Sequence, residues 1–122
     1  MLTLDEIYHA SYVLKNIIYR TELIYAPNIS QKYNIFLKPE NLQLTGSFKV
    51  RGSYYKISQL SEEEKAKGVI ACSAGNHAQG VALAATKNGI KSLICLPDGA
   101  PISKVEATRN YGAEICLVKG VY

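Results

Sequence analysis

The stretch GVIACSAGNHAQGVALAATKNGIKSLICLP, residues 68 to 97, decides the fold class of this chain. It begins with the apolar run GVIACS (68–73) and ends with a second one, KSLICLP (91–97). Continuous apolar runs of this length are typical of strands buried in a parallel sheet. The segment between them (75–89) predicts a helix that ends at Asn88-Gly89. The order strand, helix, strand indicates a right-handed βαβ unit.

The same alternation continues towards the C-terminus. PISKVEATRNYG (101–112) predicts a second helix, and AEICLV (113–118) predicts a third strand. We therefore predict an α/β fold, built as a parallel βαβαβ three-layer unit over residues 61–122. A helical N-terminal segment, residues 1–60, precedes this unit.

Earlier in the chain, four elements are expected: a helix over 4–18, a strand over 35–40, a helix over 47–60 and a helix over 61–67. Residues 20–34 are expected to be irregular, with a short helix after Asn28. A Ser or Thr followed three residues later by Glu predicts a capping box at a helix start. Three such pairs occur: Thr3/Glu6, Ser61/Glu64 and Ser103/Glu106.

Composition excludes several classes of protein. The chain is 48% hydrophobic and 20% charged, which is enough apolar material for a core and argues against disorder. No apolar run approaches the ~18 residues of a membrane span, and the first twenty residues lack a signal-peptide cleavage pattern. The formal charge of +4 comes from lysines interleaved with acids, so nucleic-acid binding is not indicated. We expect a cytoplasmic protein.

The three cysteines are Cys72, Cys95 and Cys116, and each lies inside an apolar run. No pair has C-x-x-C spacing. We expect buried, reduced thiols rather than metal ligands or a disulfide.

The segment CSAGNHAQG (72–80) is the first candidate site, because ligands of open parallel sheets bind beyond the carboxyl ends of the strands. A strand runs into Ser73, Ala74 and Gly75, and a helix begins near Asn76. Free backbone N–H groups at such a helix N-terminus bind anions. The alternative is an ordinary βα turn with Asn76 as its N-cap. The segment lacks G-x-G-x-x-G, which disfavours a dinucleotide site.

The segment TGSFKVRGSYYKI (45–57) is the second candidate, because Lys49 and Arg51 lie in the first turn of a predicted helix. The helix dipole disfavours cations there. Because the dipole disfavours the ammonium form, a larger fraction of Lys49 side chains would carry the free amine that forms a Schiff base. Phe48 beside it could stack on an aromatic cofactor. The alternative is a solvated surface lysine. Arg51 is expected to pair with an acidic residue elsewhere and receives no catalytic role.

Three long segments together resemble the pyridoxal-phosphate enzymes of fold type II: FLKPENLQLTGSFKVRGSYYKI (36–57), KGVIACSAGNHAQGVALAA (67–85) and LPDGAPISKVEATRNYGAE (96–114). Within that group the chain is most similar to threonine ammonia-lyases, also called threonine dehydratases. Thr45-Gly46, and the lack of a regulatory extension before Leu2, are more similar to the catabolic branch. The resemblance implies that 61–122 is most of a small domain, incomplete, and that 1–60 packs on a large domain.

The same resemblance implies the site residues and pyridoxal 5'-phosphate as the cofactor. Lys49 would form the Schiff base, Phe48 would pack on the pyridine ring and Asn76 would bond the ring hydroxyl. The substrate carboxylate would be held by a loop of five residues: Ser73, Ala74, Gly75, Asn76 and His77. No metal is expected.

The implied reaction is β-elimination, in which L-threonine gives 2-oxobutanoate and ammonia and L-serine gives pyruvate. Serine racemases resemble the chain closely but carry an acid–base serine at the position of Ala74, so we expect no appreciable racemisation. AMP or ADP is the expected effector, with Thr45 and Gln79 as its candidate contacts or as ordinary polar residues at a helix end. A homo-oligomer is expected.

The resemblance further implies that the glycine-rich phosphate loop and the group facing the pyridine nitrogen lie beyond position 122. We expect this chain to be the N-terminal portion of a longer enzyme and to be inactive alone. Three alternatives remain: a non-catalytic module that binds small anions, a relative of serine racemase or serine dehydratase, and a purely structural α/β fragment.

Overall fold

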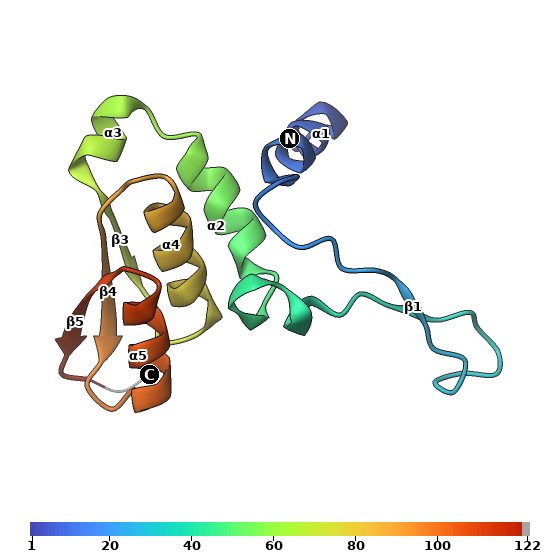
Figure 1. Ribbon diagram of the computed structural model, residues 1–122. Coiled ribbons are helices and arrows are strands. Elements are labelled where there is room, and N and C mark those ends of the chain that lie inside the picture. Colours follow the sequence, from blue (N-terminus) through green and yellow to red (C-terminus); the bar gives the residue numbers. More distant parts are fainter. Residues whose placement is uncertain (121–122) are drawn as a thin grey trace.

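The parallel sheet predicted from residues 68–118 forms the C-terminal half of the protein. A computed structural model describes residues 1–120. Strands β3 (Val69–Cys72), β4 (Ser92–Pro97) and β5 (Glu114–Val118) pair in the order β3-β4-β5, and both pairings are parallel. Helices α4 (Asn76–Lys87) and α5 (Ile102–Asn110) lie together on one face of this sheet (Figure 1). One face is used because both crossovers move across the sheet in the same direction with the same hand. The α/β prediction is therefore confirmed.

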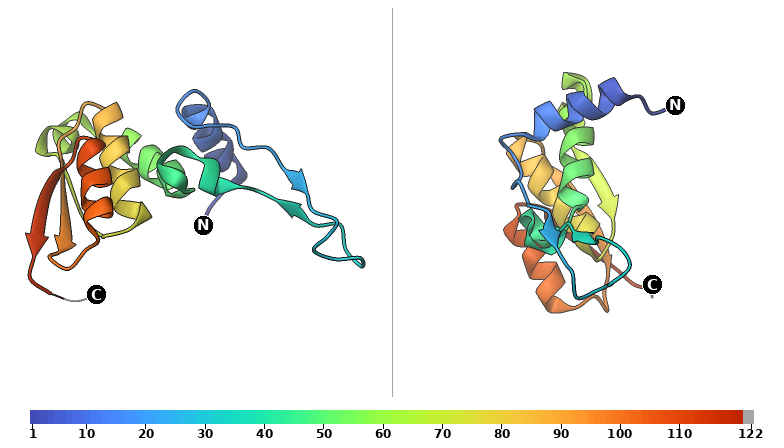
Figure 2. Two further views of the ribbon diagram at one scale, coloured as in Figure 1. Left: turned by 60° about the horizontal axis from the view of Figure 1, so that its bottom comes forward. Right: turned by 90° about the vertical axis from the view of Figure 1, so that its right-hand side faces the viewer.

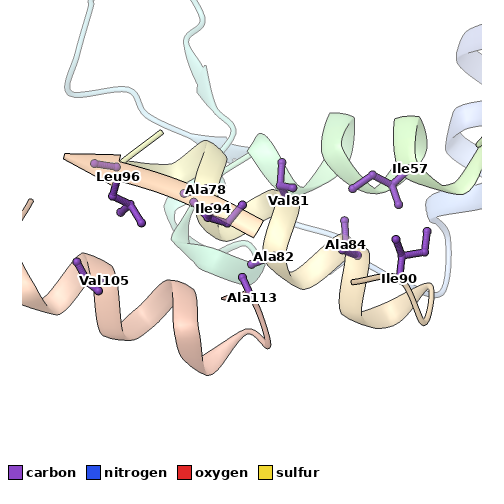
Figure 3. Close-up of a cluster of buried hydrophobic side chains, with 12 residues drawn as sticks. Ile57, Ala78, Val81, Ala82, Ala84, Ile90, Ile94, Leu96, Val105 and Ala113 are labelled. Atoms are coloured by element: carbon purple, nitrogen blue, oxygen red, sulfur yellow. The ribbon is translucent and has the colours of Figure 1, made fainter. Parts of the chain in front are cut away.

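The hydrophobic core fills the space between the sheet and its helices (Figure 3). From the sheet, Ile94 and Leu96 are almost completely buried, at 0% and 1% exposed. Most of the core side chains of α4 are alanines, which let the helix approach the sheet closely. Helix α2 (Lys49–Ser58) packs on α4 from outside and adds Ile57 to the core. The layers thus run from α2 through α4 and α5 to the sheet.

The N-terminal segment consists of short elements, most of which lie away from the sheet. They are α1 (Leu4–Leu14), β1 (Ile24–Tyr25), β2 (Phe36–Leu37) and the 3₁₀ turns η1 (Glu40–Leu42) and η2 (Leu44–Gly46), and α2 and α3 (Glu62–Lys67) follow. β1 and β2 pair antiparallel and form an arm that projects away from the sheet (Figure 2). No helix among residues 1–120 is long and apolar enough to cross a bilayer.

Several local predictions are wrong. The helix expected over 4–18 ends at Leu14, where the hydrogen bonds change to the i, i+3 spacing of a turn: the N–H of Lys15 donates to the carbonyl of Tyr12 and that of Ile17 to the carbonyl of Leu14. The strand expected over 35–40 is only Phe36–Leu37, and turns replace the short helix after Asn28. The two N-terminal capping boxes are confirmed, but the Ser103/Glu106 box is absent. Pro101 is the N-cap of α5, so Ser103 already lies inside the helix.

The prediction of three buried thiols is also wrong. Cys72 is exposed, and Cys95 and Cys116 are half-buried. The cause is the one-sided packing of the sheet, because the face opposite α4 and α5 has no helix on it in the part of the chain described here.

Candidate active site

Lys49 stands at the first position of α2, and the local backbone fixes it there. Thr45 and Gly46 precede it with positive φ angles of 63° and 66°, a conformation that a non-glycine residue rarely adopts. Ser47 is then extended, and its Oγ accepts the backbone N–H of Lys49 at 3.1 Å. Lys49 and Phe48 are both exposed, and Lys49 Nζ lies 5.1 Å from the centre of the Phe48 ring. The predicted amine and aromatic ring are therefore neighbours at the start of a helix.

The loop after β3 is held at the carboxyl edge of the sheet. The backbone N–H of Ser73 donates to the carbonyl of Cys95 at 3.1 Å, and Ser73 Oγ accepts the N–H of Gly75 at 3.3 Å. Helix α4 then begins at Asn76, and no side chain caps its N-terminus. Its first-turn N–H groups lack partners within the helix and can bind an anion.

Gly80 determines how closely the two helices approach. A Cβ built at Gly80 would lie 3.2 Å from the carbonyl carbon of Lys49 and 3.1 Å from Ser53 Oγ. Both distances are shorter than most Cβ atoms make to a neighbouring atom. The absence of a Cβ at Gly80 therefore allows α2 and α4 to cross this closely. The contact lies at Lys49 itself, one turn along α4 from the loop. Gly80 therefore fixes the position of the lysine relative to the loop.

Sequence reasoning missed Gly80, although one signal was present. A glycine inside a helix costs about 1 kcal/mol relative to alanine, so its presence there indicates a packing reason.

A cavity of about 390 Å³ opens beside Lys49, and it joins part of the predicted site. Its lining consists of Phe48, Lys49, Arg51, Gly52, Ser53, Lys56 and His77. Of the predicted loop residues, only His77 reaches this wall. Ser73 lines a separate cavity over the open face of the sheet. Ser53 Oγ is buried and has no hydrogen-bond partner within residues 1–120, which marks it as a polar contact that sequence reasoning missed.

A larger cavity, about 760 Å³, lies between α1 and the segment around Arg51. None of the predicted cofactor or carboxylate residues lines it. Size alone therefore does not locate the site.

Arg51 pairs with an acid, as predicted, and receives no catalytic role. Its Nε and Nη2 each donate to a different carboxylate oxygen of Glu40 at 2.7 Å. Thr21 Oγ1 donates to the same carboxylate at 2.7 Å, and Lys38 Nζ donates to the carbonyl of Thr21. This network ties the N-terminal segment to the first turn of α2, two residues from Lys49. The hydrogen bonds from Arg51 lower the pKa of Glu40 to about 2, although partial burial opposes them.

Acid is expected to weaken the fold through Glu40. A folded pKa below the ordinary value of 4.5 means that ionised Glu40 stabilises the fold above that value. The contribution is lost as the pH falls towards about 2. We expect a loss of about 2 kcal/mol in the free energy of unfolding, a figure reduced for solvent screening because the Arg51 side chain is 32% exposed. Urea unfolding followed by circular dichroism at several pH values measures it.

Glu40→Gln should remove that part of the pH dependence, and Glu63→Gln on exposed α3 is the matched control. Equal pH dependence in Glu40→Gln and the unchanged chain would contradict the assignment.

The two candidate effector contacts are both buried. Thr45 is 9% exposed and Gln79 is 6% exposed. Thr45 Oγ1 has no hydrogen-bond partner in the described part of the chain. Neither residue lines the cavity beside Lys49.

Comparison with known proteins places this geometry in a family. Residues 14–122 match the model of the family described as "Pyridoxal-phosphate dependent enzyme". The L-threonine ammonia-lyase of Thermotoga maritima is 52% identical over 124 residues, which is 100% of this chain and 31% of that protein. The chain spans about a third of the length of the curated relatives it matches.

Solved structures agree with this match. The serine racemase of Dictyostelium discoideum has a TM-score of 0.92 at 35% identity, and the match covers 98% of this chain and 40% of the racemase chain. The processed form of threonine deaminase isoform 2 from Solanum lycopersicum has a TM-score of 0.84 at 35% identity, and the match covers 98% of this chain and 35% of the tomato chain. The chain belongs to the pyridoxal-phosphate dependent enzyme family.

Proposed function

We propose that this chain supplies the cofactor lysine and the carboxylate loop of a lyase that converts L-threonine into 2-oxobutanoate and ammonia. L-Serine would give pyruvate in the same way. The observation that carries the proposal is the contact at Gly80, which holds the N-terminal ends of α2 and α4 together beside one cavity. The relative named L-threonine ammonia-lyase, 52% identical along the whole chain, supports threonine as the substrate.

The residues around the cavity fit pyridoxal phosphate. Lys49 offers an exposed amine, and Phe48 offers an exposed aromatic face beside it. Ser53 Oγ is a buried polar atom without a partner among residues 1–120, in the wall of the same cavity. An amine, an aromatic face and an unpaired hydroxyl match the aldehyde, ring and polar substituents of the cofactor.

Each residue would have a distinct task. When bound, pyridoxal phosphate supplies a carbonyl for amines and a ring that withdraws electrons from the α-carbon. Lys49 Nζ would hold the cofactor and then take the α-proton of the substrate. Phe48 would pack on the ring, and Asn76 would donate to the ring hydroxyl. The N–H groups of residues 73–77, with Ser73, would bind the carboxylate at the positive end of the α4 dipole.

Ala74 separates this proposal from the racemase alternative, which the likeness to serine racemases favours. Racemisation needs a second acid–base group on the far side of the reacting carbon, and a methyl side chain cannot transfer a proton. Ala74 is 8% exposed and lies in the loop between Ser73 and Gly75. We therefore expect elimination without appreciable formation of D-serine.

An Ala74→Ser variant tests this expectation. It is expected to raise D-serine formation about 10-fold or more, because a placed acid–base group contributes at least that much. Chiral chromatography of the products measures it, in a chimera in which this chain replaces the matching part of the Thermotoga maritima relative. D-Serine formation comparable to elimination before the substitution would refute the lyase proposal.

Further expectations accompany this function. We propose a division into residues 1–60, which would pack on a large domain, and 61–122, which form part of a small domain. We also predict a homo-oligomer, a cytoplasmic location and a role in amino-acid catabolism. An AMP or ADP effector near Thr45 and Gln79 remains a prediction as well.

The direct test is turnover by the same chimera. We expect 2-oxobutanoate and ammonia in equal amounts from L-threonine. A folded chimera that binds phosphate but does not react with the cofactor at Lys49 would instead favour a non-catalytic anion-binding module.

A further inference from the structure

The three cysteines lie side by side on the sheet. Cys72 at the end of β3 is in register with Cys95 of β4, and Cys95 is in register with Cys116 of β5. Residues in register on neighbouring strands project to the same face about 4.8 Å apart. The thiols therefore form a cysteine row (Cys72, Cys95 and Cys116) with Cys95 in the middle.

The cysteine row lies on the face of the sheet opposite α4 and α5, where residues 1–120 place no helix. The side chains on either side of Cys95 along β4, Ile94 and Leu96, are buried against the helices. Cys72 is exposed, and the other two thiols are half-buried. A cavity of about 270 Å³ opens onto the row, lined by Cys72, Ser73, Cys95, Leu96, Pro97, Val118, Lys119 and Gly120. A small thiol reagent can therefore reach Cys72 first.

The central thiol interacts with both of its neighbours. Partial burial raises the pKa of the Cys95 thiol. The neighbouring thiols raise this pKa further: Cys116, which is hydrogen-bonded to Cys95, has the larger effect and Cys72 the smaller. Cys95 is thus poorly disposed to become the first attacking thiolate in solution. It lies within reach of a sulfur on either side.

We infer that the cysteine row is an oxidation site that takes a low-molecular-weight disulfide at Cys72 and ends as an intrachain disulfide on Cys95. This inference does not depend on the proposed lyase activity. Disulfides inside cells are usually transient and redox-sensing, which is the chemistry expected of such a site.

The reaction proceeds in two exchanges. The Cys72 thiolate attacks one sulfur of the small disulfide, forms a mixed disulfide and releases one small thiolate. The Cys95 thiolate then attacks Cys72 Sγ, forms the Cys72–Cys95 bond and releases the second small thiolate. Two electrons pass from the protein to the small disulfide, and the two protons of the cysteines pass to solvent or to the released thiolates. Cys116 can then attack Cys95 Sγ, which moves the bond to Cys95–Cys116 and frees Cys72.

Geometry makes Cys95 obligatory. Disulfides need Cα atoms about 4.4 to 6.8 Å apart, and neighbouring strands provide about 4.8 Å. Cys72 and Cys116 are separated by two strand spacings, about 10 Å, which no disulfide spans. Oxidation would also restrain the start of the loop, because Ser73 follows Cys72 and its N–H binds the carbonyl of Cys95.

The test uses glutathione disulfide as the probe on the whole 122-residue chain. After acid quenching and alkylation, a non-reducing digest and mass spectrometry locate each bond. We expect Cys72–Cys95 or Cys95–Cys116 bonds that a reductant reverses, and no Cys72–Cys116 bond. Cys95→Ser should lose every intrachain bond and keep glutathione on Cys72. Cys116→Ser, the matched control, should still form Cys72–Cys95.

Three results on the unchanged chain would overturn the inference, and they decide it even if Cys95→Ser fails to fold. These are glutathione that stays on Cys72 while Cys95 is alkylated, a Cys72–Cys116 bond, or bonds formed only between chains.

Discussion

Replacing Lys49 by alanine is expected to lower threonine turnover in the chimera by about 10³-fold or more. Lys49 would both hold the cofactor and move the α-proton, and a placed acid–base group alone contributes about 10²- to 10⁴-fold. The side chain is exposed at the start of α2 and makes its contact with Phe48, so its loss should leave the fold intact. Steady-state assay of 2-oxobutanoate measures the effect.

Lys56→Ala is the matched control for that experiment. Lys56 is also exposed, lies on the same helix and lines the same cavity. We expect the control to keep most of its turnover. Equal losses in the two variants would mean that the cavity needs positive charge rather than a reacting amine at Lys49.

Gly80→Ala is expected to destabilise the chain by about 2 kcal/mol, in the range typical of overpacked cores. The added methyl group would meet the backbone of Lys49 at 3.2 Å and 3.3 Å, and backbone cannot rotate away as a flexible side chain can. The gain in helix propensity, about 1 kcal/mol, offsets only part of the strain. Denaturant unfolding measures the net change, and borohydride labelling at Lys49 should fall with it.

The same substitution at Gly52 should act in the opposite direction. Gly52 lies inside α2, and a Cβ there would meet nothing within 4 Å. Gly52→Ala should therefore stabilise the chain by up to about 1 kcal/mol through helix propensity alone. If Gly80→Ala also stabilised the chain, the close approach of α2 and α4 would not be what positions Lys49.

Local patterns were sufficient to predict the sheet and its helices. The strands of the βαβαβ unit are continuous apolar runs, and Asn88-Gly89 marks the end of α4, so element order and pairing follow from residues close in sequence. β1 and β2 have two residues each, which is too short for any periodicity to reveal. The Ser103/Glu106 pattern failed because Pro101 already starts the helix.

The candidate site could be predicted only as a set of residues. Local patterns identified Lys49 and the loop at 73–77 as separate candidates, and only the resemblance implied that they serve one cofactor. Their approach depends on Gly80 contacting a residue 31 positions earlier. The pairing of Arg51 with Glu40 and the alignment of the cysteine row likewise depend on tertiary contacts and strand register.

Borohydride trapping shows whether Lys49 is the amine that reacts with pyridoxal phosphate. The 122-residue chain is incubated with pyridoxal phosphate, reduced and digested, and mass spectrometry locates the modified lysines. We expect Lys49 to be labelled well above the other ten lysines of the chain. Labelling spread evenly over all eleven would contradict it, because Lys49 would then be one surface amine among many.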